Sequence, residues 1–219
     1  MSEQLTDEEQ VEALKKWWKE NGTAIIVGIL IGISAIVGFW KWNEYTETQA
    51  KAASLLYDNF VMALSDEKAD VTNSYDSLRK DYEGTSYAAL AALRMAAADY
   101  EKGETDKAIT HLQWVTEHPG HDSIQHIARI RLSELYVAED KLDEAEALLK
   151  GINEPAFDAQ YQAVRGDLYN KRGNTDKARA AYQLALTSSS FSGKQREFVQ
   201  MKLDDLGGAQ ESEQAGEDK

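Results

Sequence analysis

The sequence predicts an all-α protein in which a single N-terminal transmembrane helix leads into a solenoid of helical hairpins. Three observations support this fold class. Residues 21–40 contain no charged side chain, and related short segments recur further along the chain at intervals of about 34 residues. Only 2 of the 219 residues are proline. A composition dominated by Ala, Leu, Glu and Lys favours helices over strands.

The first segment, residues 1–20, is predicted to be an amphipathic helix on the cytoplasmic surface of the membrane. Thr6-Asp7-Glu8-Glu9 has the form of a capping box, in which a threonine and a glutamate satisfy free amides at a helix start. Val11, Leu14 and Trp18 then fall on one helical face. The helix is expected to stop before Asn21-Gly22, and a frayed tail is the alternative.

Residues 21–42 are predicted to cross the membrane once. A helix as long as the uncharged run spans about 30 Å, which matches the hydrocarbon core of a bilayer. Aromatic side chains suited to the headgroup region flank the run at Trp17, Trp18, Trp40, Trp42 and Tyr45. The acidic segment before the run and the bulky residues after it indicate an uncleaved signal anchor rather than a signal peptide. A buried core helix is the alternative, but the run is too long for one in so polar a chain.

The lysines around the span give a weak indication of orientation. Lys15, Lys16 and Lys19 precede it, whereas Lys41 and Lys51 follow it. Because the side with more lysine and arginine tends to stay in the cytoplasm, we expect a cytoplasmic N-terminus. The large C-terminal part of the chain then lies across the membrane.

Small residues within the span suggest a helix-packing surface. Ala24, Gly28 and Gly32 recur every fourth residue and therefore share one helical face, while Ser34 and Gly38 form a second pair on an adjacent face. Small side chains at this spacing let a partner helix approach closely in lipid. The alternative is that these residues reflect only the general abundance of glycine in membrane helices.

Residues 43–86 are predicted to form a juxtamembrane helical hairpin. The stretch 42–65 has no Pro or Gly and carries apolar residues at helical spacing, so the membrane helix is expected to continue into the soluble domain. A shorter helix is expected over 70–82, and Glu83-Gly84-Thr85 should end it.

Residues 87–207 are predicted to form helical-hairpin repeats with a C-terminal capping helix. The segments 103–108, 140–145 and 173–178 each contain a turn, an Asp, a charged residue and then an Ala. This pattern resembles the tetratricopeptide repeat (TPR), in which two helices flank each turn. The first unit departs from it, because Asp99 stands where a large aromatic is expected. The alternative is an ordinary helical bundle.

The end of the chain is expected to cap the solenoid and then lose order. Residues 193–206 carry apolar side chains suited to covering the last hairpin. Gly207-Gly208 should end that helix, and residues 208–219 are predicted to be a disordered acidic tail.

A solenoid of this kind presents a concave groove lined by the first helix of each hairpin. The predicted groove residues are Leu90, Leu93, Ala97, Ile127, Ile130, Glu134, Ala163, Asp167 and Asn170. This surface is apolar at one end and acidic at the other, which suits an unfolded or amphipathic protein segment. The alternative is that many of its apolar members pack between neighbouring hairpins.

Composition and motifs argue against several function classes. A net charge of −14 disfavours nucleic acid binding, and the absence of cysteine excludes disulfides and thiolate chemistry. The spacing of His111, His118, His121 and His126 does not fit a metal site, so these side chains are expected to be solvated. No nucleophile motif or phosphate-binding loop is present. We therefore expect no catalytic residues, no cofactor and no enzyme activity.

The order of these features resembles the family of ancillary SecYEG translocon subunits over nearly the whole chain. The resemblance is carried by an acidic start that runs into Trp17-Trp18-Lys19-Glu20-Asn21-Gly22, the glycine-spaced span, Trp40-Lys41-Trp42 and Ala50-Lys51-Ala52-Ala53-Ser54 before the hairpins. The acidic extension after Leu206 is not expected of that family.

The resemblance implies a single-pass protein of the inner membrane of a Gram-negative bacterium, with a cytoplasmic N-terminus and a periplasmic repeat domain. It implies as partners the SecYEG translocon, the membrane-anchored chaperone PpiD, unfolded or nascent periplasmic proteins and the lipid bilayer, but no nucleic acid. The implied role is to help transfer emerging secretory or outer-membrane proteins to periplasmic chaperones. A membrane-tethered scaffold for envelope stress signalling or cell-envelope assembly is the alternative function.

Overall fold

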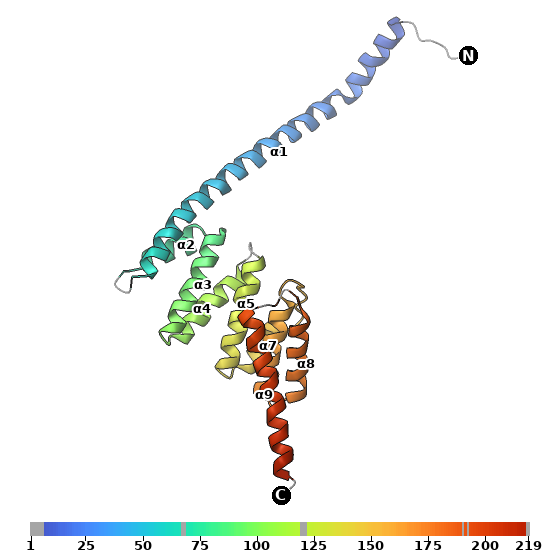
Figure 1. The fold of residues 1–219 in the computed structure, drawn as a ribbon. Helices are drawn as coiled ribbons and strands as arrows, with labels where there is room; N and C mark the ends of the chain where they lie inside the picture. The colour runs from blue at the N-terminus through green and yellow to red at the C-terminus, as the bar shows by residue number, and fades with distance from the viewer. Residues whose placement is uncertain (1–6, 67–68, 119–121, 190, 192, 218–219) are drawn as a thin grey trace, which may run out of the picture. The chain divides into compact units, whose positions relative to one another are not determined.

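The computed structural model describes residues 7–66, 69–118, 122–189, 191 and 193–217 (Figure 1). Within these ranges the chain forms nine helices and no strand, which confirms the all-α prediction. The chain divides into two compact units, residues 1–52 and 53–219. The helices are α1 (Asp7–Leu64), α2 (Thr72–Asp81), α3 (Ser86–Glu101), α4 (Thr105–Glu117), α5 (Asp122–Ala138), α6 (Leu142–Leu149), α7 (Asp158–Lys171), α8 (Thr175–Thr187) and α9 (Gly193–Glu217).

The described part of the first unit is the stretch of the long helix α1 up to residue 52, which runs without interruption through Asn21-Gly22. The sequence predicts a helix end here, whereas the structure keeps both residues in the helix. The Asn21 amide donates to the Trp17 carbonyl at 2.9 Å, and the Trp18 ring lies 3.0 Å from where a Gly22 Cβ would stand. One glycine costs a helix only about 1 kcal/mol, which is too little to break so long an element. Thr6 of the predicted capping box lies outside the described residues.

Among the described helices, α1 alone is long and apolar enough to cross a membrane. Its large apolar side chains project outward, with Ile31 65% exposed and Phe39 62% exposed. Side chains of this kind are stable on a helix surface when lipid surrounds it. α1 then continues to Leu64, as the absence of Pro and Gly after Trp42 predicts.

The second unit is built from three helical hairpins, α3–α4, α5–α6 and α7–α8, at the predicted places. Their three turns share one geometry. Gly103, Asp140 and Gly173 adopt positive φ angles of 78°, 60° and 73°. Glycine adopts this conformation freely, and aspartate tolerates it better than most residues.

Each turn also closes the preceding helix with the same pair of hydrogen bonds. In the first turn, the Gly103 amide donates to the Tyr100 carbonyl at 2.9 Å and the Glu104 amide donates to the Asp99 carbonyl at 2.8 Å. The second and third turns repeat both bonds. This Schellman motif satisfies carbonyls that a helix end leaves free and reverses the chain. The second helix of each hairpin therefore starts at a fixed place.

The repeated alanines lie where the two helices of each hairpin cross. Ala108, Ala145 and Ala178 are each 0% exposed. A methyl group is small enough to let the two helices approach closely, and Leu112, Leu149 and Tyr182, one turn further on, are also buried. The described residues thus confirm the TPR-like arrangement that the repeat spacing predicts.

Helical elements cover both ends of the hairpin stack. At the N-terminal end, Phe60 of α1 and Leu78 of α2 are fully buried in the core that continues into α3. At the C-terminal end, α9 packs on α8 through Val199 and Leu206, which are 3% and 6% exposed. These elements shield apolar faces that a terminal repeat would otherwise present to water.

The backbone of α9 continues as helix through Gly207-Gly208 to Glu217, beyond the predicted helix end. The sequence predicts disorder from residue 208, so the structure differs here over 208–217. The following residues are mainly Ala, Gln and Glu, and all three are good helix formers. Residues 218–219 lie outside the described residues.

Gly166 gives a direct test of hairpin packing, because a Cβ at this position would overlap the ring of Tyr182. We expect Gly166→Ala to lower the free energy of unfolding by about 1–3 kcal/mol through overpacking. Urea unfolding of the purified protein measures the change. The matched control is Gly207→Ala, because a Cβ there meets nothing within 4 Å. The control should be neutral or slightly stabilising, and an equal effect of both substitutions would refute the packing argument.

Candidate functional site: a groove between the hairpins and the C-terminal helix

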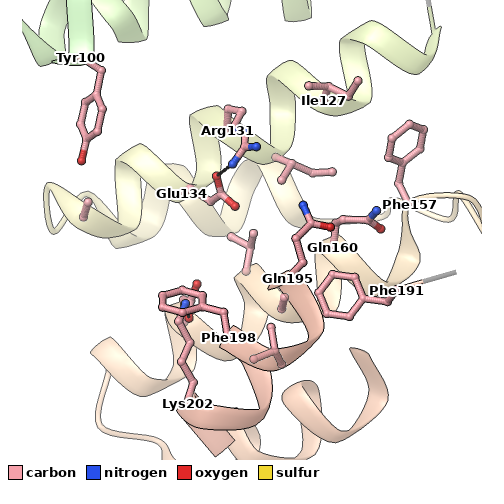
Figure 2. Close-up of a pocket in the computed structure, with 16 residues that line it drawn as sticks. Tyr100, Ile127, Arg131, Glu134, Phe157, Gln160, Phe191, Gln195, Phe198 and Lys202 are labelled. Carbon is pink, nitrogen blue, oxygen red and sulfur yellow. Dashed lines mark hydrogen bonds and ion pairs between the residues drawn. The ribbon is translucent and has the colours of Figure 1, made fainter. Parts of the chain in front are cut away.

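The concave side of the second unit contains a groove. Its larger pocket has a volume of about 820 Å³ and lies between α5, α7 and α9, with Tyr100 of α3 at its margin (Figure 2). The labelled side chains in Figure 2 come from these helices and from the loops before α7 and α9. The pocket is lined by Tyr100, Ile127, Ile130, Arg131, Glu134, Ala138, Phe157, Gln160, Ala163, Val164, Asp167, Phe191, Gln195, Phe198, Val199 and Lys202.

A smaller pocket of about 380 Å³ extends the groove toward α3. It shares Tyr100, Ile127, Arg131, Glu134 and Ala138 with the larger pocket. Leu93, Ala96 and Ala97 form its α3 wall. The two pockets therefore form one continuous surface, which we call the groove.

The structure brings most of the predicted groove residues together. Ile127, Ile130, Glu134, Ala163 and Asp167 line the larger pocket. Leu93 and Ala97 line the smaller one. Asn170 lines a neighbouring recess of about 480 Å³ together with Glu134 and Asp167. Leu90 is half-buried and lies against none of these spaces, because it sits further toward the start of α3.

Several groove residues are ones that the sequence argument missed. Phe198, Val199 and Lys202 come from α9, which the sequence predicts only as a cap. Phe157 and Phe191 come from loops. The TPR pattern assigns a groove to the first helix of each hairpin, so it carries no signal for a wall made by a later helix. One signal in the sequence was available. Phe198 and Lys202 are four residues apart, so they share a face of α9 on which an apolar side chain is followed by a basic one.

The carboxylates of the groove are neutralised by neighbouring cations, so its predicted acidic end is not a free negative surface. Arg131 donates to Glu134 at 2.9 Å within α5. Lys202 of α9 donates to Asp167 of α7 at 2.6 Å, and the Tyr182 hydroxyl donates to the same carboxylate oxygen at 2.7 Å. Burial and the Asp167 charge raise the pKa of Tyr182, which keeps its hydroxyl a donor. The sequence missed these pairs because two of the three join different helices.

The groove keeps an apolar surface open to solvent. Tyr100 is 50% exposed, Ile127 40% and Phe198 54%. Three large apolar side chains exposed along one concavity mark an interaction surface more readily than scattered ones would. A concave apolar surface with paired charges can bind a protein segment.

The described histidines are structural rather than solvated, which corrects the expectation from sequence. His111 Nδ1 lies 2.6 Å from the Tyr75 hydroxyl, and its Nε2 lies 3.0 Å from Asp99 Oδ2. His118 stacks on Trp114, and His126 accepts from or donates to the Tyr161 hydroxyl at 2.7 Å. Histidine side chains can serve as core hydrogen-bonding groups, and their positions in the sequence do not reveal it. His121 lies outside the described residues.

Asp99 occupies the slot where the repeat pattern expects an aromatic residue, and His111 explains the exception. The Asp99 carboxylate can only accept, so His111 Nε2 donates to it and neutral Nδ1 accepts from Tyr75. Asp99 is 6% exposed, and these bonds satisfy a charge that would otherwise be costly to bury. Within the described residues, no group of three or more His, Asp or Glu side chains is placed to hold a metal ion.

The proposed helix-packing residues of α1 lie on its exposed surface. Ala24, Gly28, Gly32, Ser34 and Gly38 are all exposed. A Cβ built on Gly28, Gly32 or Gly38 would meet no described atom within 4 Å. Packing among the described residues therefore does not require glycine at these three positions.

These features define a class: a TPR-like helical repeat protein with one candidate membrane-spanning helix before the repeats. The family model of the tetratricopeptide repeat-like domain matches residues 15–208, and so includes most of that helix as well as the hairpins. Relatives that match nearly the whole chain narrow the class further. The chain belongs to the family of ancillary SecYEG translocon subunits, which confirms the resemblance seen in the sequence.

Three relatives illustrate the match, and each is named an ancillary SecYEG translocon subunit. The protein of Escherichia coli (strain K12) is 30% identical over 200 residues, which cover 91% of this chain and 96% of the relative. That of Haemophilus influenzae is 27% identical, over 94% of this chain and 100% of the relative. That of Neisseria gonorrhoeae is 25% identical with the same coverage, 94% and 100%. No solved structure matches the chain.

The buried cluster around His111 makes the stability of the repeat unit depend on pH. Burial lowers the pKa of His111; Asp99 opposes the shift, and Arg79 and Lys107 add to it. The folded protein therefore binds the His111 proton less readily than the unfolded chain does. Stability should be complete above the ordinary histidine pKa of about 6.5 and should fall as pH drops from there through the lowered folded pKa.

Thermal unfolding of the full-length protein between pH 5 and pH 7.5 measures this dependence. Substitution His111→Gln keeps a donor and an acceptor but cannot titrate, so the fall toward acid pH should become smaller. His111→Ala leaves Asp99 buried without its partner and should lower stability at pH 7.5 by about 1–3 kcal/mol. An unchanged pH profile in His111→Gln would contradict the assignment.

Proposed function

We propose that this chain is a membrane-anchored, protein-binding adaptor that works beside the SecYEG translocon. The observation that carries the proposal is its match over 96% of the Escherichia coli relative, whose name describes an ancillary translocon subunit. The continuity of α1 supports it, because one helix joins the candidate membrane span to the unit that carries the groove.

In this proposal the protein resides in the inner membrane, with its N-terminus in the cytoplasm and its repeat unit in the periplasm. The excess of lysine before the span supports that orientation. The absence of cysteine is compatible with an oxidising compartment, although it does not require one.

The groove is proposed to hold protein partners. Its exposed apolar side chains and paired charges suit a polypeptide better than a small polar ligand. The resemblance of the chain to its family suggests PpiD and emerging secretory or outer-membrane proteins as partners of the protein, without assigning each of them to the groove. In that role the protein helps to pass such chains to periplasmic chaperones.

The small-residue face of α1 is proposed to dock against a membrane helix of a partner. Glycine at Gly28 and Gly32 is not required by packing among the described residues, whereas close approach of a second helix would explain it. Docking through α1 would leave the groove available for other chains.

Affinity purification of the full-length protein in mild detergent tests the proposal against its alternative. Recovery of SecYEG together with a periplasmic chaperone is the expected result. Recovery of cell-wall synthases or envelope stress regulators without SecYEG would favour the second function, a scaffold for envelope assembly or signalling.

The same purification gives a prediction for the α1 face. The double substitution Gly28→Leu/Gly32→Leu adds bulk to this face and should reduce recovery of SecYEG several-fold, because the partner helix can no longer approach closely. The control is Ile33→Phe/Val37→Phe, which adds bulk on the opposite side of the helix. If the wild-type protein and both double variants recover the same amount of SecYEG, this face is not the docking surface.

A reporter enzyme that is active only in the periplasm gives a prediction for orientation. Fused after the last residue, it should be active in intact cells, because the C-terminal unit is proposed to lie across the membrane. The same reporter fused before residue 1 should be inactive. An inactive C-terminal fusion of normal abundance would overturn the proposed orientation.

A further inference from the structure

The groove offers few hydrogen-bonding groups to anything that binds in it. Its two carboxylates are already paired, Glu134 with Arg131 at 2.9 Å and Asp167 with Lys202 at 2.6 Å. Most of its lining comes from helices, whose backbone amides and carbonyls bond within the helix. Outside these two pairs, the polar side chains of the lining are Gln160, Gln195 and Tyr100, and Figure 2 shows the two glutamines directed into the same part of the pocket.

This scarcity decides which conformation a bound segment can have. An extended segment in the groove would bury backbone amides and carbonyls along its whole length, and each of them needs a partner. The lining supplies two amide side chains, one hydroxyl and the unused atoms of two ion pairs, which lie at a few fixed places and cannot pair a backbone along its whole length. The Oε1 atom of Gln160 is itself buried without a partner. An α-helix satisfies its own backbone, so it can enter an apolar groove without this penalty.

The apolar side chains of the groove suit the apolar face of such a helix. Tyr100, Ile127 and Phe198 stand half exposed on three different elements around the concavity. Binding of an amphipathic helix would cover them by inserting side chains spaced three and four residues apart. Because the charges of the groove neutralise one another, the inserted face needs no charged residue.

The charge of the whole protein indicates what the other face of the helix carries. The chain has a net charge of −14. The two ion pairs of the groove are each neutral overall, so they contribute little to the negative potential around the protein. A partner helix with lysine or arginine on its outer, solvent-facing side would be attracted over a long range and would face no repulsion at the contact. An acidic helix with the same apolar face would be repelled.

We propose that the groove binds an amphipathic α-helix of a partner protein, with an uncharged apolar face inserted and a basic face outward, and that it does not bind extended, unfolded segments. This inference rests on the proposed function, since it names the chemistry of the partner at the same groove. It implies that the groove recognises a formed helix, and that any unfolded client must be held elsewhere.

Four synthetic peptides of about 18 residues, long enough for five helical turns, test the proposal. The first has leucines on one helical face and lysines on the other. The second has the same composition rearranged to alternate as a strand. The third is the first with two central prolines, and the fourth replaces its lysines by glutamates. The full-length protein in zwitterionic nanodiscs is titrated with each labelled peptide, and empty nanodiscs provide the blank.

The first peptide should bind at least about tenfold more tightly than each of the other three. Its advantage over the glutamate peptide should shrink at high salt, whereas its advantage over the strand and proline peptides should persist. Tighter or equal binding of the strand or proline peptide would overturn the proposal.

Substitutions in the protein locate the binding. Ile127→Asn and Phe198→Asn change exposed groove residues and should each weaken binding of the first peptide by about tenfold. The matched control is Leu184→Asn, because Leu184 is similarly exposed at 53% and lies outside the groove lining. Unfolding midpoints of all three variants separate loss of contact from loss of fold. Equal weakening by the control and the groove variants at unchanged midpoints would overturn the proposal.

The two proposals fail in distinguishable ways. If no peptide binds but the protein still recovers SecYEG from cells, the helix-binding inference is wrong and the proposed function stands. If the first peptide binds as expected but SecYEG is not recovered, the groove assignment stands and the translocon role is wrong.

Discussion

The left-handed residue at the centre of each hairpin is the constraint on which the repeat unit depends. Gly103, Asp140 and Gly173 hold positive φ angles there, and the two hydrogen bonds of each turn fix where the next helix begins. That start places an alanine at the helix crossing, where Ala108, like its counterparts, is fully buried. Because each hairpin is thus closed in the same way, the first helices of successive hairpins can line one continuous side, and that side is the groove.

Short-range patterns in the sequence predict the hairpins. The α9 side of the groove and the buried histidine cluster depend instead on contacts between residues far apart in the chain. The turn, the aspartate and the alanine of each repeat lie within a few residues of one another, so their spacing is visible in the chain. The bond between Lys202 and Asp167 joins residues 35 apart, and the bond between Tyr75 and His111 joins residues 36 apart. No local pattern marks such pairs. The repeat pattern therefore predicts most of the groove residues on α3, α5 and α7 but none of those on α9.

Glycine illustrates why residue type alone could not assign roles. Gly166 has no room for a Cβ because the Tyr182 ring fills the space, whereas at Gly173 the φ of 73° favours glycine. Gly22 lies under the Trp18 ring inside a helix that the sequence expects to end there. Gly28 meets no described neighbour. Four identical residues thus have four different environments, and only the arrangement of their neighbours separates close packing, backbone conformation and a surface available to a partner.

The ion pairs of the groove affect both its charge and the position of the helices that line it. A buried or half-buried ion pair adds little net stability, since desolvation offsets most of the attraction. Its structural effect is larger, because Lys202 on α9 and Tyr182 on α8 both bond to Asp167 on α7. The carboxylate thereby holds the α9 wall at a set position relative to the hairpin floor. Removal of that charge would leave Lys202 without its partner and would leave α9 held mainly by its apolar packing on α8, which changes the polarity of the groove. A neutral, apolar groove in an acidic protein therefore depends on a carboxylate that the bound partner does not need to contact.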